Sequence, residues 1–426
     1  MLDFNETFQT ALDHMEQTTD HIFLTGRAGT GKSTLLTYFT KNTAKPHAII
    51  APTGVAALNV KGETIHSFFG FRPNITPQDA IREARQTEKS QLYQKITTLI
   101  IDEISMVRAD LVDCIDLFLK TVRNSPEPFG GVQMIFIGDI YQLPPVVTKD
   151  DEIIFTSTYA SPYFFDSDIF HSTNFQYKYI ELMEVYRQRD KKFINLLDKV
   201  RTNTITLTEL ENLNQRYNPD FHDYDDQYIY LTTTNKAAQE INHHKLHELG
   251  TRSYTYTGSR NKDFPANQLP TDEKLTLKES AQIMFLNNDP AGRWVNGTIG
   301  HILEVNHEGI IAITTEGKEV EVKPFTWRMY GYTYNATSDA LSQEPLGSFT
   351  QLPVKLAWAI TIHKSQGKTF DNVIIDLGWG SFAHGQTYVA FSRCRSLNGI
   401  ILKKPIEPRH IIMDDRVKSF VEYLER

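Results

Sequence analysis

The residues from Gly26 to Ser33 carry the most specific chemistry in this sequence. Their order, Gly-Arg-Ala-Gly-Thr-Gly-Lys-Ser, fits the phosphate-loop pattern G-x-x-x-x-G-K-[ST] at every position. The glycines let backbone N–H groups turn toward one point, and the start of the next helix adds partial positive charge there. We therefore expect Lys32 to reach the β- and γ-phosphates of a nucleoside triphosphate and the Ser33 hydroxyl to bind Mg²⁺.

The segments around this loop fit the same interpretation. An apolar run at 22–24 predicts a buried parallel strand before the loop, and the spacing of Leu35, Leu36 and Phe39 predicts a helix after it. The sequence thus predicts a nucleoside-triphosphate site that uses Mg²⁺. Its expected nucleotide-binding residues in this region are Gly26, Ala28, Gly29, Thr30, Gly31, Lys32, Ser33 and Thr34.

Two carboxylates follow a second apolar run. Leu99-Ile100-Ile101 reads as a strand, and Asp102 and Glu103 come directly after it. We expect this strand to lie beside the one that feeds the phosphate loop, so that Asp102 helps to hold Mg²⁺ and Glu103 orients or deprotonates the attacking water. Alone, such a pair often marks only a turn, but after a phosphate loop it favours hydrolysis.

A glutamine follows a third apolar run. The strand-like residues 133–137 end at Gly138-Asp139, and Gln142 comes just before two prolines. Ligands of α/β proteins bind at the carboxyl ends of sheet strands. We therefore expect the Gln142 amide to contact the γ-phosphate, with a proline-rich exit loop as the alternative interpretation.

Composition limits the classes of protein. A chain of 426 residues predicts two or more domains. The net charge of −8 argues against bulk electrostatic coating of duplex DNA, but it leaves room for a narrow single-strand groove with a few local cations and aromatic stacking. Neither a signal pattern nor a membrane-length apolar run is visible, so we expect a cytoplasmic protein with no membrane partner. Two cysteines predict neither a disulfide framework nor a zinc site.

Alternation of strands and helices organises most of the chain. In the first part, strands are predicted at 22–24, 48–51, 97–101 and 133–137, typical of a parallel sheet covered by helices. A second alternating region begins near Asp166. It has predicted strands at 227–231, 352–355, 372–375 and 399–402, and predicted helices at 191–200, 235–249, 358–366 and 386–393. Between about 250 and 347, short runs separated by Asn, Gly and Asp turns predict a small antiparallel barrel.

The order of these motifs resembles that of superfamily 1 DNA helicases, and more narrowly the PIF family of the RecD-like branch. The resemblance rests first on the phosphate loop, 51–57, 64–68, Asp102-Glu103, and Pro-Phe-Gly-Gly-Val-Gln at 128–133 leading to Gly138-Asp139-x-x-Gln142. In the second half it rests on 182–188, 231–238, 281–284, 295–298, 357–369 and 386–393.

The resemblance implies an α/β fold with two RecA-like, parallel-sheet P-loop motor domains. The first would cover 1–165, with a small wedge-like insertion at about 62–76. The second would cover 166–250 and 348–426, with a small antiparallel β-barrel inserted at 251–347.

The resemblance also implies roles for residues far from the phosphate loop. Arg187 and Arg393 would point at the γ-phosphate as arginine fingers, and Gly367 would contact the nucleotide. The alternative for each arginine is an ordinary ion pair. By the same resemblance, the expected DNA-binding residues are Pro52, Thr53, Gly54, His66, Phe68, Thr234, Asn235, Asn296, Gly297, His363 and Lys364. Two of these sites also have a purely structural alternative, since Phe68 can be a core residue and Asn296-Gly297 can be a hairpin turn.

The implied activity is ATP-driven translocation on single-stranded DNA in the 5′→3′ direction, with unwinding of duplex, forked and G-quadruplex DNA. Two alternatives remain open: an ATPase that remodels protein–DNA complexes without separating strands, and a nucleotide-gated switch. No apolar stripe predicts obligate assembly, so we expect a monomer, in the bacterial nucleoid. The sequence departs from the family pattern at one place. Members of the family often have a glutamine before the phosphate loop that recognises adenine, but Phe8 stands at that position here and Gln9 follows one residue late. The resemblance therefore leaves the selectivity for adenine open.

Overall fold

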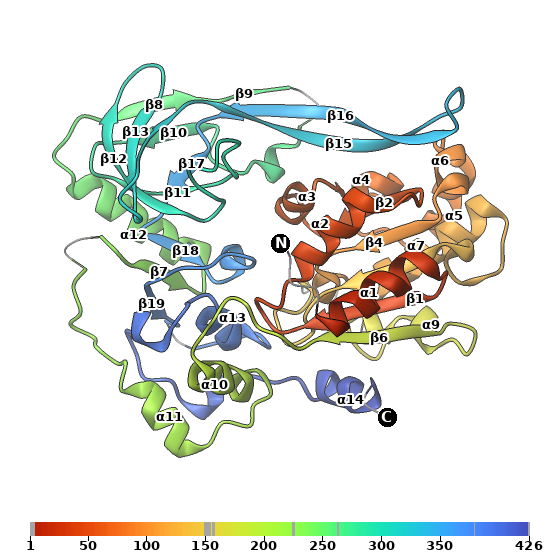
Figure 1. The fold of residues 1–426 in the computed structure, drawn as a ribbon, viewed down its shortest axis with the longest axis horizontal. Coiled ribbons are helices and arrows are strands. Elements are labelled where there is room, and N and C mark those ends of the chain that lie inside the picture. The colour runs from red at the N-terminus through yellow and green to blue at the C-terminus, as the bar shows by residue number, and fades with distance from the viewer. Residues whose placement is uncertain are drawn as a thin grey trace. The chain divides into compact units, whose positions relative to one another are not determined.

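Contacts within the chain divide it into two compact units (Figure 1). The fold is that of a computed structural model that describes residues 5–148, 155, 158–223, 226–261, 264–378 and 380–424. The first unit comprises Met1–Tyr186, Arg328–Leu346 and Asp414–Arg426, and the second comprises Arg187–Trp327 and Gly347–Met413. The chain therefore passes between the units several times.

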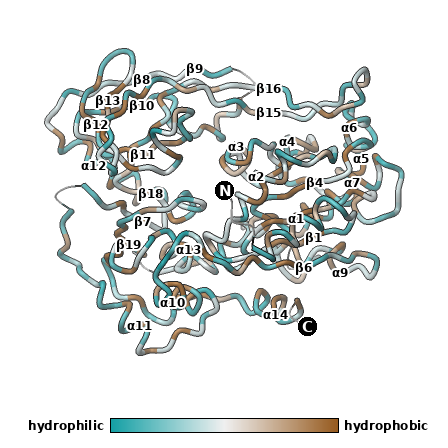
Figure 2. The backbone as a smooth tube through the Cα atoms, in the orientation of Figure 1, coloured by the Kyte–Doolittle hydropathy of each residue, from teal (hydrophilic) through white to brown (hydrophobic). Residues whose placement is uncertain are grey.

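A six-stranded parallel sheet forms the centre of the first unit, with strand order β3-β2-β4-β5-β1-β6. Its central strands are buried apolar runs, as predicted, and Figure 2 shows hydrophobic residues along them. The strands are β1 (His21–Gly26), β2 (His47–Ala51), β3 (Glu63–Thr64), β4 (Thr98–Ile101), β5 (Gln133–Ile137) and β6 (Tyr177–Leu182).

The strand order corrects one prediction from the sequence. Strand β4, which carries Asp102 at its end, does not lie beside β1, because β5 pairs with both of them. The strand that leads to Gln142 is therefore the direct neighbour of the strand that feeds the phosphate loop. Parallel strands still bring all three carboxyl ends to one edge of the sheet.

The first unit also contains the helices that follow or precede these strands. They are α1 (Glu6–Gln17), α2 (Lys32–Asn42), α3 (Gly54–Val60), α4 (Ile65–Phe69), α5 (Pro77–Gln86), α6 (Ser90–Lys95), α7 (Ala109–Arg123), α9 (Asp168–His171) and α14 (Asp415–Leu424). The last helix also packs here, because the Phe420 ring stacks on Phe165 with centroids 4.2 Å apart. Two segments that the predicted division gave to the second domain, 166–186 and 414–426, thus contact the first unit. The division itself stays a prediction.

The second unit has a smaller parallel sheet, ordered β18-β7-β19-β20. Its strands are β7 (Ile229–Thr232), β18 (Ala359–Thr361), β19 (Val373–Asp376) and β20 (Ile400–Leu402), and its helices are α10 (Lys191–Arg201), α11 (Leu207–Asn214), α12 (Asn235–Glu248) and α13 (Gln386–Ser392). The helix predicted at 358–366 is wrong. The residues form β18 and a short 3-10 turn, His363–Ser365, since a buried apolar run fits a central strand as well as a helix.

An antiparallel sheet, ordered β14-β13-β12-β11-β17, occupies the middle of the chain. It is formed by β11 (Gln282–Phe285), β12 (Ile299–Val305), β13 (Ile310–Thr314), β14 (Glu319–Val322) and β17 (Val354–Leu356), and a separate pair joins β8 (Tyr254–Thr257) to β10 (Lys274–Leu277). Strand β17 was predicted among the strands of the second alternating region, yet it pairs with β11. The α/β fold class, with a parallel sheet and antiparallel sheets, is confirmed.

A long two-stranded hairpin of β15 (Phe325–Asn335) and β16 (Ala340–Gln351) was not predicted (Figure 1). Its outer part belongs to the first unit. There the Tyr332 hydroxyl accepts a hydrogen bond from the backbone N–H of Ile49 (2.8 Å), and Gln343 Nε2 donates to the Lys61 carbonyl (2.9 Å). None of the helices in the described ranges has the length and hydrophobicity needed to span a bilayer.

Candidate nucleotide and DNA sites

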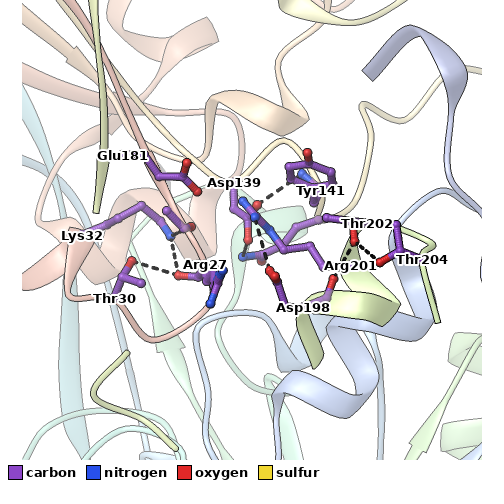
Figure 3. A network of polar contacts seen from close by, with 12 residues as sticks. Arg27, Thr30, Lys32, Asp139, Tyr141, Glu181, Asp198, Arg201, Thr202 and Thr204 are labelled. Carbon is purple, nitrogen blue, oxygen red and sulfur yellow. Dashed lines mark hydrogen bonds and ion pairs between the residues drawn. The ribbon is translucent and has the colours of Figure 1, made fainter. Parts of the chain in front are cut away.

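The phosphate loop lies between β1 and α2, as the sequence predicts. Gly29 and Gly31 adopt φ angles of +87° and +89°, a left-handed region that glycine reaches without strain. Lys32 Nζ donates to the carbonyl oxygens of Gly26 (2.5 Å) and Arg27 (3.1 Å), and the Thr30 hydroxyl also donates to Arg27 (2.9 Å). Figure 3 shows both side chains directed at the Arg27 carbonyl. The ammonium group is thus held inside the loop, where a phosphate anion can replace the carbonyl partners.

The hydroxyl groups of Ser33 and Thr34 lie on the exposed first turn of α2. A magnesium ion at this place would therefore meet an oxygen donor from the loop and, across the sheet edge, the Asp102 carboxylate. No cluster of three or more His, Cys, Asp or Glu side chains fit for a metal occurs in the described part of the chain. A site with only Ser33 and Asp102 as protein ligands suits Mg²⁺, because this ion usually keeps several waters and phosphate oxygens among its ligands.

Asp102 and Glu103 follow β4 as predicted. Asp102 is buried, and both its burial and the neighbouring Glu103 charge raise the pKa of its carboxyl, while Lys32 acts in the opposite direction. Lys32 is therefore close enough to Asp102 to interact electrically with it. Glu103 has φ of +53°, a left-handed conformation that turns the chain sharply after the strand. Carboxylates crowded in this way are stabilised in the charged form by a cation.

Gln142 is buried in the turn after β5. Its side-chain nitrogen donates to Asp139 Oδ2 (3.1 Å), and its backbone N–H donates to the Asp139 carbonyl (2.9 Å). Asp139 Oδ1 also accepts from the backbone N–H of Tyr141 (3.2 Å). Asp139 therefore fixes the direction of the Gln142 amide. This positioning role was not predicted from the sequence, although Asp139 stands inside the Gly-Asp-x-x-Gln pattern.

Arg187 and Arg393, both in the second unit, meet at Ser392. Arg187 Nη1 donates to the Ser392 carbonyl (3.2 Å), and Arg393 Nη2 donates to the Ser392 hydroxyl (2.7 Å). Burial lowers the pKa of the Arg187 guanidinium. The two charges are thus brought together at the end of α13. Their predicted contact with the γ-phosphate stays a prediction.

Gln188 holds this arrangement and was missed by the sequence analysis. Its side-chain nitrogen donates to the carbonyls of Ser392 (3.1 Å) and Cys394 (2.9 Å), on both sides of Arg393. The signal in the sequence is its place beside Arg187 at the end of the motif 182–188. A glutamine that bridges two carbonyls in a buried place fixes the backbone that carries the arginine.

The segment 363–368 lies next to Arg393. Arg393 Nη1 donates to the Ser365 carbonyl (3.3 Å), and Gly367, with φ of +75°, turns the chain so that the Lys368 N–H also donates to Ser365 (3.0 Å). Burial lowers the pKa of His363, whereas Lys364 is exposed. One short segment, 363–368, therefore contains both the predicted nucleotide residue Gly367 and the predicted DNA residues His363 and Lys364.

Two threonines predicted to bind DNA have matching local geometry. Thr53 (φ −126°, ψ 153°) caps α3 and accepts from the Ala56 N–H, and Thr234 (φ −127°, ψ 148°) caps α12 and accepts from the Ala237 N–H, each at 3.2 Å. Both follow a parallel strand within their own unit. The next residues, Gly54 and Asn235, begin the helices, and Pro52 precedes the first cap. This repetition supports a common role, which stays a prediction.

The structure places Phe68 in the core, so it does not stack on a base there. The ring is 0% exposed and packs edge-on against Phe69, Tyr93 and Tyr332. This corrects the DNA-binding prediction in favour of the core alternative, because a Thr-capped turn at α4 directs the ring inward. His66, two residues earlier, is only partly buried, and burial together with nearby Arg108 lowers its pKa.

Asn296 and Gly297 lie in the turn between β11 and β12. Gly297 has φ of +98°, and its N–H donates to the Phe285 carbonyl (2.8 Å). The Asn296 side-chain oxygen accepts from Lys368 Nζ (2.7 Å). The two residues form a local turn, closed by the Thr298 N–H on the Val295 carbonyl (3.0 Å), within the long segment 286–298 and not a tight hairpin turn. The DNA role stays a prediction.

The region expected to receive adenine contains Phe8 and not a glutamine. The buried Phe8 ring lies 3.7 Å from the place where a Gly31 side chain would begin, and Tyr186 lies at 3.8 Å. Gln9 points elsewhere, because its amide donates to Asp13 (2.8 Å). Asn5 caps α1 and donates to Glu184 (2.9 Å). Aromatic rings thus border the phosphate loop here.

Comparison with known proteins connects these features. A family model described as PIF1-like helicase matches residues 3–211. The chain is 34% identical over 414 residues to the ATP-dependent DNA helicase Pif1 of Bdellovibrio bacteriovorus, covering 95% of this chain and 89% of that protein.

Solved structures agree. The crystal structure of Bacteroides sp. Pif1 in complex with ADP-AlF4 matches with a TM-score of 0.92 and 36% identity, over 100% of this chain and 98% of that one. A complex of the Bacteroides helicase with ADP-AlF3 and ssDNA matches with a TM-score of 0.72 and 36% identity, over 100% and 98%. Identity at this level over nearly the full length of both chains shows that this chain belongs to the Pif1 helicase family.

Proposed function

We propose that this chain is an ATP-dependent DNA helicase that translocates 5′→3′ on single-stranded DNA and unwinds duplex, forked and G-quadruplex DNA. The observation that carries the proposal is the shared sheet edge. The phosphate loop, Asp102 with Glu103, and Gln142 follow three neighbouring strands of one parallel sheet, in a chain of a helicase family. The names of the relatives support the activity, and the resemblance of the motifs supports the direction.

In this proposal each side chain has one task. Lys32 leaves the Gly26 and Arg27 carbonyls and binds the phosphates, and Gln142, aimed by Asp139, senses the γ-phosphate. Glu103 takes the proton of the attacking water. Arg187 and Arg393 stabilise the charge that develops on the transferred phosphoryl group. Mg²⁺, when bound by Ser33, Asp102 and the phosphates, neutralises phosphate charge.

The proposal extends to the setting of the reaction. The proposed partners are single-stranded and forked DNA, with the chain acting as a monomer at the bacterial nucleoid. The support is the similarity to a bacterial relative and the two arginines already present in one chain, which need no finger from a neighbouring subunit.

Strand separation on two fluorescent partial duplexes tests this proposal. One duplex carries a 5′ single-stranded tail and the other a 3′ tail, each with and without Mg-ATP. We expect ATP-dependent opening of the 5′-tailed substrate alone. Opening from the 3′ tail alone would contradict the polarity. If neither opens while single-stranded DNA still accelerates ATP hydrolysis, the chain is a remodelling ATPase, and if DNA has no effect on hydrolysis, it is a nucleotide-gated switch.

A further inference from the structure

Three lysines from two segments of the second unit lie close together. Lys355 is on β17, Lys364 is in the turn His363–Ser365, and Lys368 follows Gly367. Lys355 pairs with Met284 on β11, and the next residue, Phe285, accepts from the N–H of Gly297 (2.8 Å) in the turn that Lys368 contacts. Lys368 and Lys364 also both lower the pKa of Lys355. Lys355 and Lys368 are partly buried, and Lys364 is exposed.

The charges in this group, here called the lysine cluster (Lys355, Lys364, Lys368), are not balanced. Among the described residues, no carboxylate lies within 4.0 Å of any of the three ammonium nitrogens. Asp272 opposes the lowering of the Lys355 pKa, and its effect is the weakest of those that act on this lysine. Holding like charges together in a partly buried place without a counterion costs free energy. The cluster is therefore built to receive an anion.

The surroundings of the cluster indicate which anion. Lys368 Nζ donates to Asn296 Oδ1 (2.7 Å), and a side chain added at Gly297 would begin 3.6 Å from Lys368 Cβ. The neighbouring Val295 side chain is 61% exposed. An exposed apolar side chain beside a glycine turn and several cations suits a strand of nucleic acid, which offers sugar and base faces together with phosphates. A small inorganic anion would have no use for the apolar surface.

We propose that Lys355 and Lys368 form, together with Lys364, a binding site for consecutive backbone phosphates of single-stranded DNA. This inference rests on the proposed helicase function and assigns two DNA-binding residues that the motifs did not indicate. Lys355 was not apparent because its strand lies between motifs, and Lys368 was not apparent because it follows the predicted nucleotide residue Gly367.

Binding of DNA at this site should be accompanied by proton uptake by the protein. Burial and the neighbouring lysines lower the pKa of Lys355 to about 7, and burial lowers that of Lys368 to about 8. A phosphodiester is an anion throughout this range, and it stabilises the protonated amines, so binding raises both pKa values. Near pH 8 the protein therefore takes up protons when DNA binds, whereas near pH 6 both lysines are already charged. His363 is neutral at pH 8.0, because burial lowers its pKa below its ordinary value, so the uptake at that pH comes from the lysines.

Calorimetry of the full chain with a thymidine 15-mer measures this uptake. The binding enthalpy is compared at pH 8.0 in Hepes, Tricine and Tris, whose ionisation enthalpies differ, and again at pH 6.0. We expect uptake of about one proton at pH 8.0 and about none at pH 6.0. We also expect the affinity to fall as the pH rises from 7 to 9.

Variants assign the protons to the cluster. K355Q and K368Q should each weaken binding by about threefold to tenfold at pH 7 and reduce the uptake at pH 8.0. K355R should keep the affinity at pH 8.5 and lose its share of the uptake, since arginine is always charged. K323Q removes an exposed lysine of the same unit that pairs with Glu321, and it should change neither quantity. Thermal unfolding midpoints check that each variant is folded.

Several outcomes would overturn the inference. DNA binding without proton uptake at pH 8.0, or uptake that persists in both glutamine variants, removes the lysine cluster from the DNA site while the helicase proposal stands. If 5 mM inorganic phosphate causes the expected proton uptake and the oligonucleotide causes none, the lysine cluster is a site for a small anion. Failure to bind the oligonucleotide at all would overturn the helicase proposal as well.

Discussion

Ser392 gathers two positive side chains that sit far apart in the sequence. Its carbonyl accepts from Arg187 and its hydroxyl accepts from Arg393, while Gln188 fixes the same carbonyl. Arg393 also donates to the Val389 carbonyl (2.9 Å). Both guanidinium groups are thus oriented by hydrogen bonds to Ser392 and to neighbouring backbone carbonyls. These hydrogen bonds fix the direction of both side chains, as a role toward a bound phosphate requires.

Removal of either arginine should therefore affect turnover more than folding. We expect Arg187→Ala and Arg393→Ala each to lower the DNA-stimulated kcat by about 10³-fold or more, with only a modest change in nucleotide affinity. Steady-state ATPase assays and nucleotide titrations measure the two effects. Arg395→Ala is the matched control. This exposed arginine stands two residues after Arg393 and pairs with Asp371 (2.7 Å), so its removal should leave kcat unchanged.

If kcat falls only as far as the folded fraction falls, the arginine has a structural role. Thermal unfolding of each variant gives that fraction. The buried Arg393 makes several hydrogen bonds, so some loss of stability is expected there in either case.

At the scale of elements, the Pro-Phe-Gly-Gly stretch before β5 has a structural explanation. Phe129 has φ of +50° and a fully buried ring that packs against Phe136 (5.9 Å) and Phe175 (5.5 Å), and its N–H donates to Asp116 (2.7 Å). Gly130, with φ of +63°, then approaches α7 so closely that a Cβ would lie 2.6 Å from the Leu119 carbonyl oxygen. The stretch that most specifically indicates the family thus fastens α7 to the sheet.

The two glycines provide a matched pair of variants. Gly131 has φ of +76° with open space around its missing side chain, whereas Gly130 has none. Gly131→Ala should cost about 1 kcal/mol of unfolding free energy, from backbone strain alone. Gly130→Ala should cost more than about 3 kcal/mol, because α7 must also shift. Chemical denaturation measures both, and equal losses would show that the close approach to Leu119 does not limit this turn.

Strand β2 depends on the hairpin of β15 and β16 for one hydrogen bond. Strand β3 pairs with β2 only at Ile50 and Ala51, so the Ile49 N–H receives its partner from the Tyr332 hydroxyl. Tyr332→Phe leaves a buried N–H without that partner and should cost about 1–3 kcal/mol in denaturation experiments. Tyr330→Phe, on the same strand, should have little effect. A neutral Tyr332→Phe would mean that another group can satisfy the Ile49 N–H.

The sequence predicts elements better than it predicts their neighbours. Short apolar runs such as 133–137 were recognised as strands because burial on both faces leaves a continuous hydrophobic signal. Sheet order was not predictable from them, and β5 rather than β4 lies beside β1. The β15–β16 hairpin was missed although β15 is rich in aromatic residues, because Gly331, Pro345 and Gly347 are signals for turns. The lysine cluster was missed because its members come from a predicted strand, 352–355, and from a turn that was predicted as part of a helix, 358–366.

At the scale of the whole molecule, net charge and local charge have opposite signs. The chain carries a net charge of −8, so DNA cannot be held by a general electrostatic attraction. The lysine cluster and the two capped helix starts offer only a few phosphate contacts. Binding should accordingly depend on local geometry and base stacking more than on salt.

The salt dependence of single-strand binding tests this balance. Each phosphate contact on a single strand contributes about −0.7 to the slope of log K against log salt concentration, so three to five contacts give a slope of about −2 to −3.5. Fluorescence anisotropy titrations of a labelled oligonucleotide at several salt concentrations and at pH 7 measure the slope. K364Q should make it shallower by about 0.7, because Lys364 is exposed and one contact is lost. A wild-type slope steeper than about −6 would mean that the strand follows a far longer cationic surface than the described residues provide, and a slope near zero would leave stacking alone to hold the DNA.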